Sequence, residues 1–72
     1  MEHLGGILKE SRVEKGLSVL ELSGKTRIAV STIYAIESGI KRNNRFEIIV
    51  RLADALELDV RVLAEFYLKG IA

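Results

Sequence analysis

The 72-residue sequence contains no cysteine, no proline and no tryptophan, and it has a single histidine. Without cysteine the chain can form no disulfide, no thiolate metal site and no thiol nucleophile. One histidine, His3, is too few for the common zinc sites, and its place beside the N-terminus predicts a solvated residue. We therefore expect no metal site and no cofactor.

Long apolar runs are also absent, and the N-terminal "MEHLGGILKE" lacks the basic start of a secretion signal. These absences predict no membrane span and a cytoplasmic location. The sequence places no base beside a nucleophile and has no glycine pattern of a phosphate-binding loop. We therefore do not expect an enzyme.

Charge is nearly balanced over the whole chain, at +1, but it is unevenly distributed. Residues 25–45 contain five cationic residues and one acidic residue, a net charge of +4, which leaves −3 on the flanks. A basic middle is typical of a surface that binds nucleic acid. A solvated basic loop with no partner is the alternative interpretation.

The apolar residues, 49% of the chain, recur at helical spacing and predict an all-α fold. Five helices are expected: Leu4–Lys15, Ser18–Lys25, Val30–Ser38, a fourth opened by Asn44, and a fifth from Asp59 to Gly70. Because the connections between them are short, residues 1–72 are expected to form one compact domain.

Local signals mark several helix ends. Gly16 supplies a left-handed stop for the first helix. Ser18 and Glu21 have the spacing of a capping box, and Asn44 and Glu47 have the same spacing before the fourth helix. We expect both pairs to begin helices.

Helical spacing also assigns faces. In the third helix it places Ile33, Ile36 and Glu37 on one face, and Val30, Ser31, Tyr34 and Ala35 on the other. In the fourth helix the apolar face consists of Phe46, Ile49, Leu52, Ala53 and Leu56. Each apolar face is expected to pack in the core.

Two short predicted helices joined by a tight turn, about residues 18–38, match a helix-turn-helix unit. The segments "GLS", "EL", "KT", "STI", "IESG", "KRNNRFE" and "LADALELD" follow one another from residue 16 to residue 59. Together they resemble the Cro and phage-repressor family, often called XRE. The resemblance covers about Leu4 to Leu63 and implies a compact five-helix repressor-like domain that binds double-stranded DNA and regulates transcription.

The resemblance also implies site residues. Those of the recognition helix are Ala29, Val30, Ser31, Thr32, Tyr34 and Ala35. Those of the phosphate-binding loop are Lys41, Arg42, Asn43 and Arg45. Three or four phosphate contacts predict a log–log salt slope of roughly −3 to −4.

The sequence departs from the family pattern at three positions. Val19 stands where many relatives have a DNA-contacting Gln, Ala29 where they have Ser or Thr, and Arg27 where they have glycine in the turn. No Arg, Asn or Gln is offered for bidentate base contacts by the recognition helix. Direct base readout should therefore be weak, and specificity should depend on hydroxyl groups, methyl contacts and DNA shape.

Two further features follow from the resemblance. Arg12 and Glu37 occupy the positions of a structural ion pair. The last helix should form a homodimer through Val62, Phe66, Tyr67 and Ile71, with recognition helices about 34 Å apart.

A second interpretation is a protein-interaction module. The segments "LGGILKESR" and "KTRI" also resemble the helix-turn-helix domain of RodZ-like proteins, which binds a cytoskeletal partner. Apolar residues are expected at exposed positions: Val19, Leu20, Val30, Tyr34 and Ile40. If clustered, they would mark a protein-binding patch; if scattered, they are ordinary surface residues.

Overall fold

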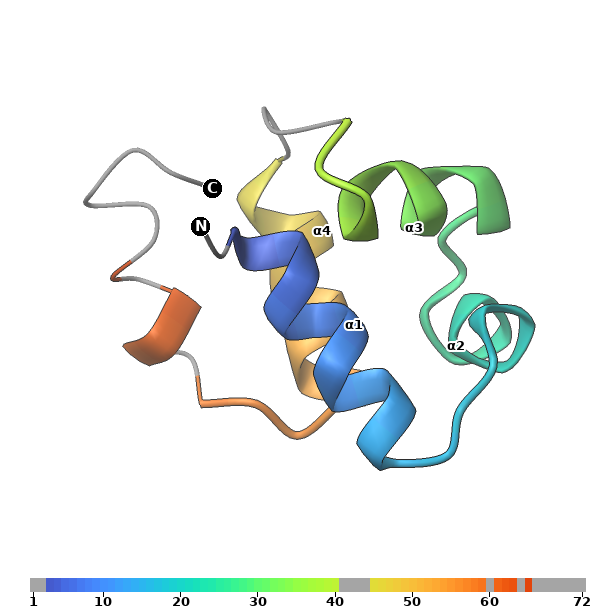
Figure 1. The fold of residues 1–72 in the computed structure, drawn as a ribbon, viewed down its shortest axis with the longest axis horizontal. Helices are drawn as coiled ribbons and strands as arrows, with labels where there is room; N and C mark the ends of the chain where they lie inside the picture. The colour runs from blue at the N-terminus through green and yellow to red at the C-terminus, as the bar shows by residue number, and fades with distance from the viewer. Residues whose placement is uncertain (1–2, 41–44, 60, 64, 66–72) are drawn as a thin grey trace.

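The computed structural model describes residues 3–40, 45–59, 61–63 and 65. Its helices are α1 (Leu4–Glu14), α2 (Val19–Thr26), α3 (Val30–Glu37) and α4 (Phe46–Ala55). Residues 61–63 are also helical, and the part of the chain that is described contains no strand (Figure 1). The predicted all-α class is thus confirmed for the described residues, whereas the expected end of the fifth helix at Gly70 lies outside them.

One core joins the helices. The helix α3 packs against α1 and α2, and α2 also packs against α4 (Figure 1). The largest fully buried side chains are Leu8, Leu22, Ile33, Ile36, Ile49, Leu52, Leu56 and Leu63. Every helix therefore contributes to a shared apolar interior, whose burial is the main stabilising term for a chain of this size.

His3 begins α1 and is not the solvated residue that the sequence predicts. Its Nδ1 accepts a hydrogen bond of 3.2 Å from the backbone N–H of Gly6. A β-carbon on Gly39 would lie 3.0 Å from its Nε2, so the imidazole lies close against that glycine. The half-buried ring thereby satisfies one of the open amides of the first turn.

The predicted start of α2 is confirmed. Ser18 Oγ accepts from the N–H of Glu21, and a carboxylate oxygen of Glu21 accepts from the N–H of Ser18, both at 3.0 Å. Gly16 has a φ of 69°, as expected for the stop after α1. These signals act within a single turn of chain, so the sequence predicts them directly.

The N-cap of α4 lies one residue later than the sequence predicts. The N-cap is Arg45, and its own side chain makes no capping hydrogen bond; Asn44 lies outside the described residues. Glu47 instead lies 3.8 Å from an Arg45 nitrogen, with both side chains exposed. Ile49 is the first residue that α4 buries.

Asp59 caps the last described helical segment, as predicted. Its Oδ1 accepts from the N–H of Arg61 at 2.9 Å. Its backbone carbonyl accepts from the N–H of Val62 at 3.1 Å. An acidic N-cap satisfies an open amide and interacts favourably with the helix dipole.

Three apolar residues do not lie where the sequence predicts. Val19 is buried, at 6% exposure, because it shares the stripe of Leu22 and Thr26 on α2. Val30 packs partly against the core, three residues before the buried Ile33. Phe46 is 50% exposed, because it lies in the first turn of α4, before its first buried residue.

Where the chain is described, no helix has the length and apolar character that a membrane crossing requires.

Candidate nucleic-acid interface

The turn between α2 and α3 keeps a left-handed residue although it has no glycine there. Arg27 has φ 61° and ψ 28°, and its N–H donates to the carbonyl of Ser23 at 2.8 Å. Non-glycine residues adopt this region at a cost of about 1–2 kcal/mol. The turn geometry is therefore retained, and the cost is offset by the packing on either side.

Side chains within the unit hold that turn. Thr26 Oγ1 donates to the carbonyl of Leu22 at 2.8 Å and accepts from the N–H of Ile28 at 3.3 Å. Ser23 Oγ donates to the carbonyl of Ile28 at 2.6 Å. Because Ile28 and Thr26 are buried, these bonds form away from competing water and fix the angle between α2 and α3.

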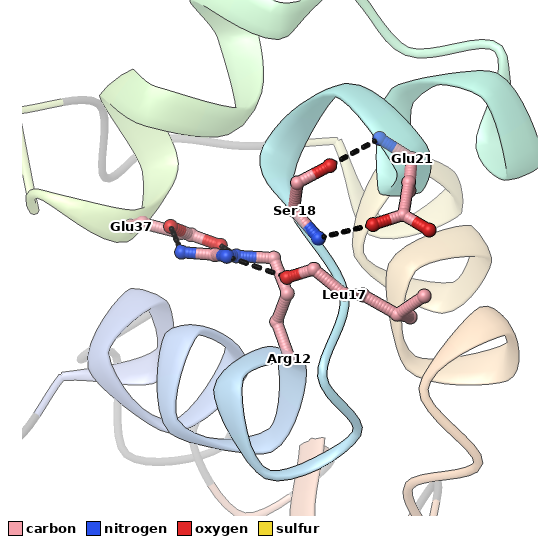
Figure 2. A network of polar contacts seen from close by, with 5 residues as sticks. All are labelled: Arg12, Leu17, Ser18, Glu21 and Glu37. Atoms are coloured by element: carbon pink, nitrogen blue, oxygen red, sulfur yellow. Dashed lines mark hydrogen bonds and ion pairs between the residues drawn. The ribbon is translucent and has the colours of Figure 1, made fainter.

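An ion pair connects α1 with the end of α3. Arg12 Nε and Nη2 donate to the two carboxylate oxygens of Glu37 at 2.8 and 3.1 Å (Figure 2). The two side chains are only 11% and 5% exposed. The hydrogen bond to Glu37 raises the pKa of Arg12 above its ordinary value. The pair thus stabilises the charged form of the guanidinium.

The same guanidinium reaches the chain that leads into α2. Arg12 Nη1 donates to the carbonyl of Leu17 at 2.8 Å, directly before the Ser18–Glu21 capping box (Figure 2). One side chain thus ties α1, α3 and the entry to α2 together. Bidentate guanidinium–carboxylate pairing is directional, so this network orients the helix-turn-helix unit on the rest of the fold.

The outward face of α3 is short of polar reading groups. Ser31 is exposed and Tyr34 is 58% exposed, while Thr32 and Ala35 are half-buried. Ala29 is the exposed N-cap and provides no side-chain hydrogen bond. Only Ser31, Thr32 and Tyr34 among these residues carry a side-chain hydrogen-bonding group.

A shallow depression runs along this face. It has a volume of about 520 Å³ and is lined by Ser31, Tyr34, Ala35, Ser38 and Ile40. Ile40 is 84% exposed. Of the apolar residues that the sequence predicts to be exposed, Tyr34 and Ile40 line the same depression. Val19 is buried and Val30 is half-buried.

Arg45 is the one residue of the predicted phosphate-binding loop that the structure describes. It is exposed at the N-cap of α4, within reach of Glu47. Lys41, Arg42 and Asn43 lie outside the described residues. Of the predicted dimer residues, Val62 is exposed, and Phe66, Tyr67 and Ile71 also lie outside them.

A basic hollow that the sequence does not predict lies between the end of α2 and α4. The hollow measures about 510 Å³ and is lined by Lys25, Thr26, Arg27, Arg51, Asp54 and Ala55. Three of these residues are cationic and one is acidic. Arg51 is distant in sequence from the other two cations, and only the packing of α2 against α4 brings it to them.

Comparison with known proteins identifies the family. The sequence matches the helix-turn-helix family over residues 8–63. A solved structure of SinR, a master regulator for biofilm formation, in complex with DNA has a similar fold, with a TM-score of 0.78 and 30% identity. The similarity covers 85% of this chain and 97% of the SinR chain. A search of curated proteins found no match. With its α2–turn–α3 unit and its match over residues 8–63, the chain belongs to the helix-turn-helix family of the Cro/phage-repressor (XRE) type.

Proposed function

We propose that this protein is a small transcriptional regulator that binds double-stranded DNA, with α3 in the major groove. The observation that carries the proposal is the similarity, over 85% of the chain, to a regulator solved in complex with DNA. The geometry supports it, because the turn hydrogen bonds and the Arg12–Glu37 pair hold α3 at the surface with its outward face exposed. An α-helix held in this way fits the width of the major groove.

Phosphate contacts are proposed at two places. The first is the loop of Lys41, Arg42, Asn43 and Arg45, of which Arg45 is exposed beside the start of α4. The second is the start of α3, where Ala29 leaves the first-turn amides without a side-chain cap. Uncapped helix N-termini bind phosphate oxygens favourably. At α2, by contrast, Ser18 already occupies one such amide.

The residues proposed to contact bases are Ser31, Thr32, Tyr34 and Ala35, together with the exposed part of the half-buried Val30. The hydroxyl groups of Ser31 and Thr32 can bond to a base edge or a phosphate. None of these side chains can form a bidentate base contact. The affinity for DNA should therefore come mainly from contacts with the DNA phosphate backbone. We therefore infer modest affinity with a clear salt dependence.

The test is fluorescence anisotropy of the protein with a labelled random-sequence duplex across a salt series. We expect binding with a log–log slope of roughly −3 to −4. Arg45→Ala should reduce the slope by about one, while Lys9→Ala, an exposed lysine on α1, should leave it unchanged. Absence of binding at low salt, or binding independent of salt, contradicts the proposal.

The second candidate function is a protein-interaction module. It is favoured by the apolar side chains of Tyr34 and Ile40, which line one depression. Protein binding at this surface would depend on those two side chains and only weakly on salt. The salt series therefore separates the two functions.

A further inference from the structure

We propose that the depression on α3 reads DNA through the 5-methyl groups of pyrimidines, thymine above all. This inference rests on the proposed function and adds the chemical group that the protein recognises. It follows from what lines the depression and from what the major groove offers to such a lining.

Among the residues that the structure describes, the lining of the depression is apolar except for two serines. Tyr34, Ala35 and Ile40 supply its apolar part, with Tyr34 and Ile40 among the exposed large apolar residues of the protein. The hydroxyl of Ser38 is already directed to the carbonyl of Ala35, at 3.2 Å. Ser31 provides a single hydroxyl, which can bond to several base edges and so discriminates little between them.

The major groove presents hydrogen-bond donors, acceptors and one apolar group, the C5-methyl of thymine. The described part of the lining carries no guanidinium or amide group, so these residues cannot distinguish the donors from the acceptors through bidentate bonds. It can distinguish a methyl group from its absence, because burying the methyl removes apolar area from water. The depression is therefore complementary to one group in the major groove, the C5-methyl of thymine.

Charge indicates DNA as the occupant rather than an apolar protein surface. The depression lies within residues 25–45, whose net charge is +4. The one acidic residue of this segment, Glu37, is neutralised by Arg12 at 2.8 Å. An apolar depression in a segment with no uncompensated acid suits a polyanion that carries apolar groups.

The experiment compares matched duplexes that differ only in the methyl group. Alternating d(A-T) is measured against alternating d(A-U), and alternating d(G-C) against the same duplex with 5-methylcytosine. Within each pair the hydrogen-bonding groups of both grooves are the same. Binding is measured by anisotropy at one low salt concentration.

We expect the methylated member of each pair to bind more tightly, by about fourfold for each methyl group buried, since one buried carbon contributes about 0.8 kcal/mol. Ile40→Ser should bring both ratios close to one. Val13→Ser is the matched control, because Val13 is an exposed aliphatic residue on α1, outside the depression. Both substituted positions are exposed, so circular dichroism should show an unchanged fold.

Ratios close to one in the wild-type protein overturn the inference while the proposed function stands. Equal weakening of all four duplexes by Ile40→Ser overturns it too, because Ile40 would then not sense the methyl group. If no duplex binds at low salt, the proposed function and the inference both fail. In that case the depression is tested next as a protein-binding surface.

Discussion

Arg27 holds a left-handed backbone conformation in a turn whose form suits glycine. Replacing it with glycine removes a strain of about 1–2 kcal/mol, although a more flexible unfolded chain offsets part of the gain. We expect Arg27→Gly to raise the free energy of unfolding by about 0.5–1 kcal/mol, measured by urea denaturation.

The control for Arg27→Gly is Lys25→Gly, two positions earlier inside α2. There the backbone is helical, and glycine should lower the free energy of unfolding by about 1 kcal/mol. A destabilisation of similar size at both positions would show that the left-handed backbone of Arg27 costs nothing.

The buried ion pair between Arg12 and Glu37 should contribute strongly to stability. Arg12→Met leaves the carboxylate of Glu37, 5% exposed, without its cation. We expect a loss of about 3–5 kcal/mol, the usual cost of removing one partner of a buried pair. Urea denaturation measures it, unless the variant is already unfolded in the absence of denaturant.

Arg61→Met is the comparison for Arg12→Met, because Arg61 pairs with Asp59 at the same 2.8 Å but is 91% exposed. Its loss should cost no more than about 1 kcal/mol. If the two substitutions cost the same, the Arg12–Glu37 pair does not orient the fold as we describe.

Contact between helices α1 and α3 depends on a glycine. A β-carbon on Gly5 would lie 1.8 Å from the carbonyl oxygen of Ile36, a backbone atom that no side-chain rotation can move. Gly5→Ala must therefore separate the two helices, and we expect a loss of about 1–3 kcal/mol or more. Thermal unfolding followed by circular dichroism measures the change.

Gly24 in α2 provides the matched substitution. A β-carbon there would meet no atom within 4 Å. Gly24→Ala should therefore stabilise the helix by about 0.5–1 kcal/mol. If both alanine substitutions destabilise the protein, the loss at Gly5 cannot be attributed to its close packing against Ile36.

Acid should weaken the start of α2. The hydrogen bonds that Glu21 makes with Ser18 lower the pKa of its carboxyl group. A carboxylate with a lowered pKa in the folded state stabilises the protein above its unfolded value, and this contribution is lost as the pH falls through the folded value. The capping box should therefore lose stability below about pH 4.5, the ordinary value of the group.

Unfolding midpoints between pH 7 and 2 test this expectation with Glu21→Gln. The glutamine variant keeps a similar shape without a titrating group, so its midpoint should fall less steeply in acid than that of the wild type. Parallel curves for the two proteins would exclude Glu21 as a source of the acid sensitivity.

We propose that the whole molecule acts as a homodimer through its last helix, as the resemblance to the phage-repressor family implies. Val62 is the described residue of the proposed interface, and it is exposed. Val62→Glu should raise the dimer dissociation constant at least about tenfold, because a buried interface disfavours an unpaired charge. Sedimentation over a range of concentrations measures it.

Val13→Glu introduces the same charge at another exposed valine, on α1, and should leave the sedimentation unchanged. A wild-type protein that is monomeric at all concentrations, or a Val62→Glu dimer of unchanged strength, would contradict the proposed interface.

Much of the fold could be predicted from the sequence, but the site only in outline. The stop at Gly16 and the Ser18–Glu21 box are correct because each acts within one turn of chain. The Asn44–Glu47 pair has the same spacing as that box, but the N-cap of α4 is Arg45, one residue later, and Asn44 lies outside the described residues. Tyr34 was placed correctly on the exposed face of α3, whereas Val30 was not, because it lies at the edge between two faces.

The sequence by itself determined the helices, the family and the scarcity of base-reading side chains on α3, since periodicity, short-range caps and residue identity are local properties. Tertiary structure alone decided that Gly5 meets Ile36 and that Tyr34 and Ile40 line one depression. Each of these contacts depends on how one segment approaches another. Such distances are set by close packing in three dimensions and leave no periodic signal along the chain.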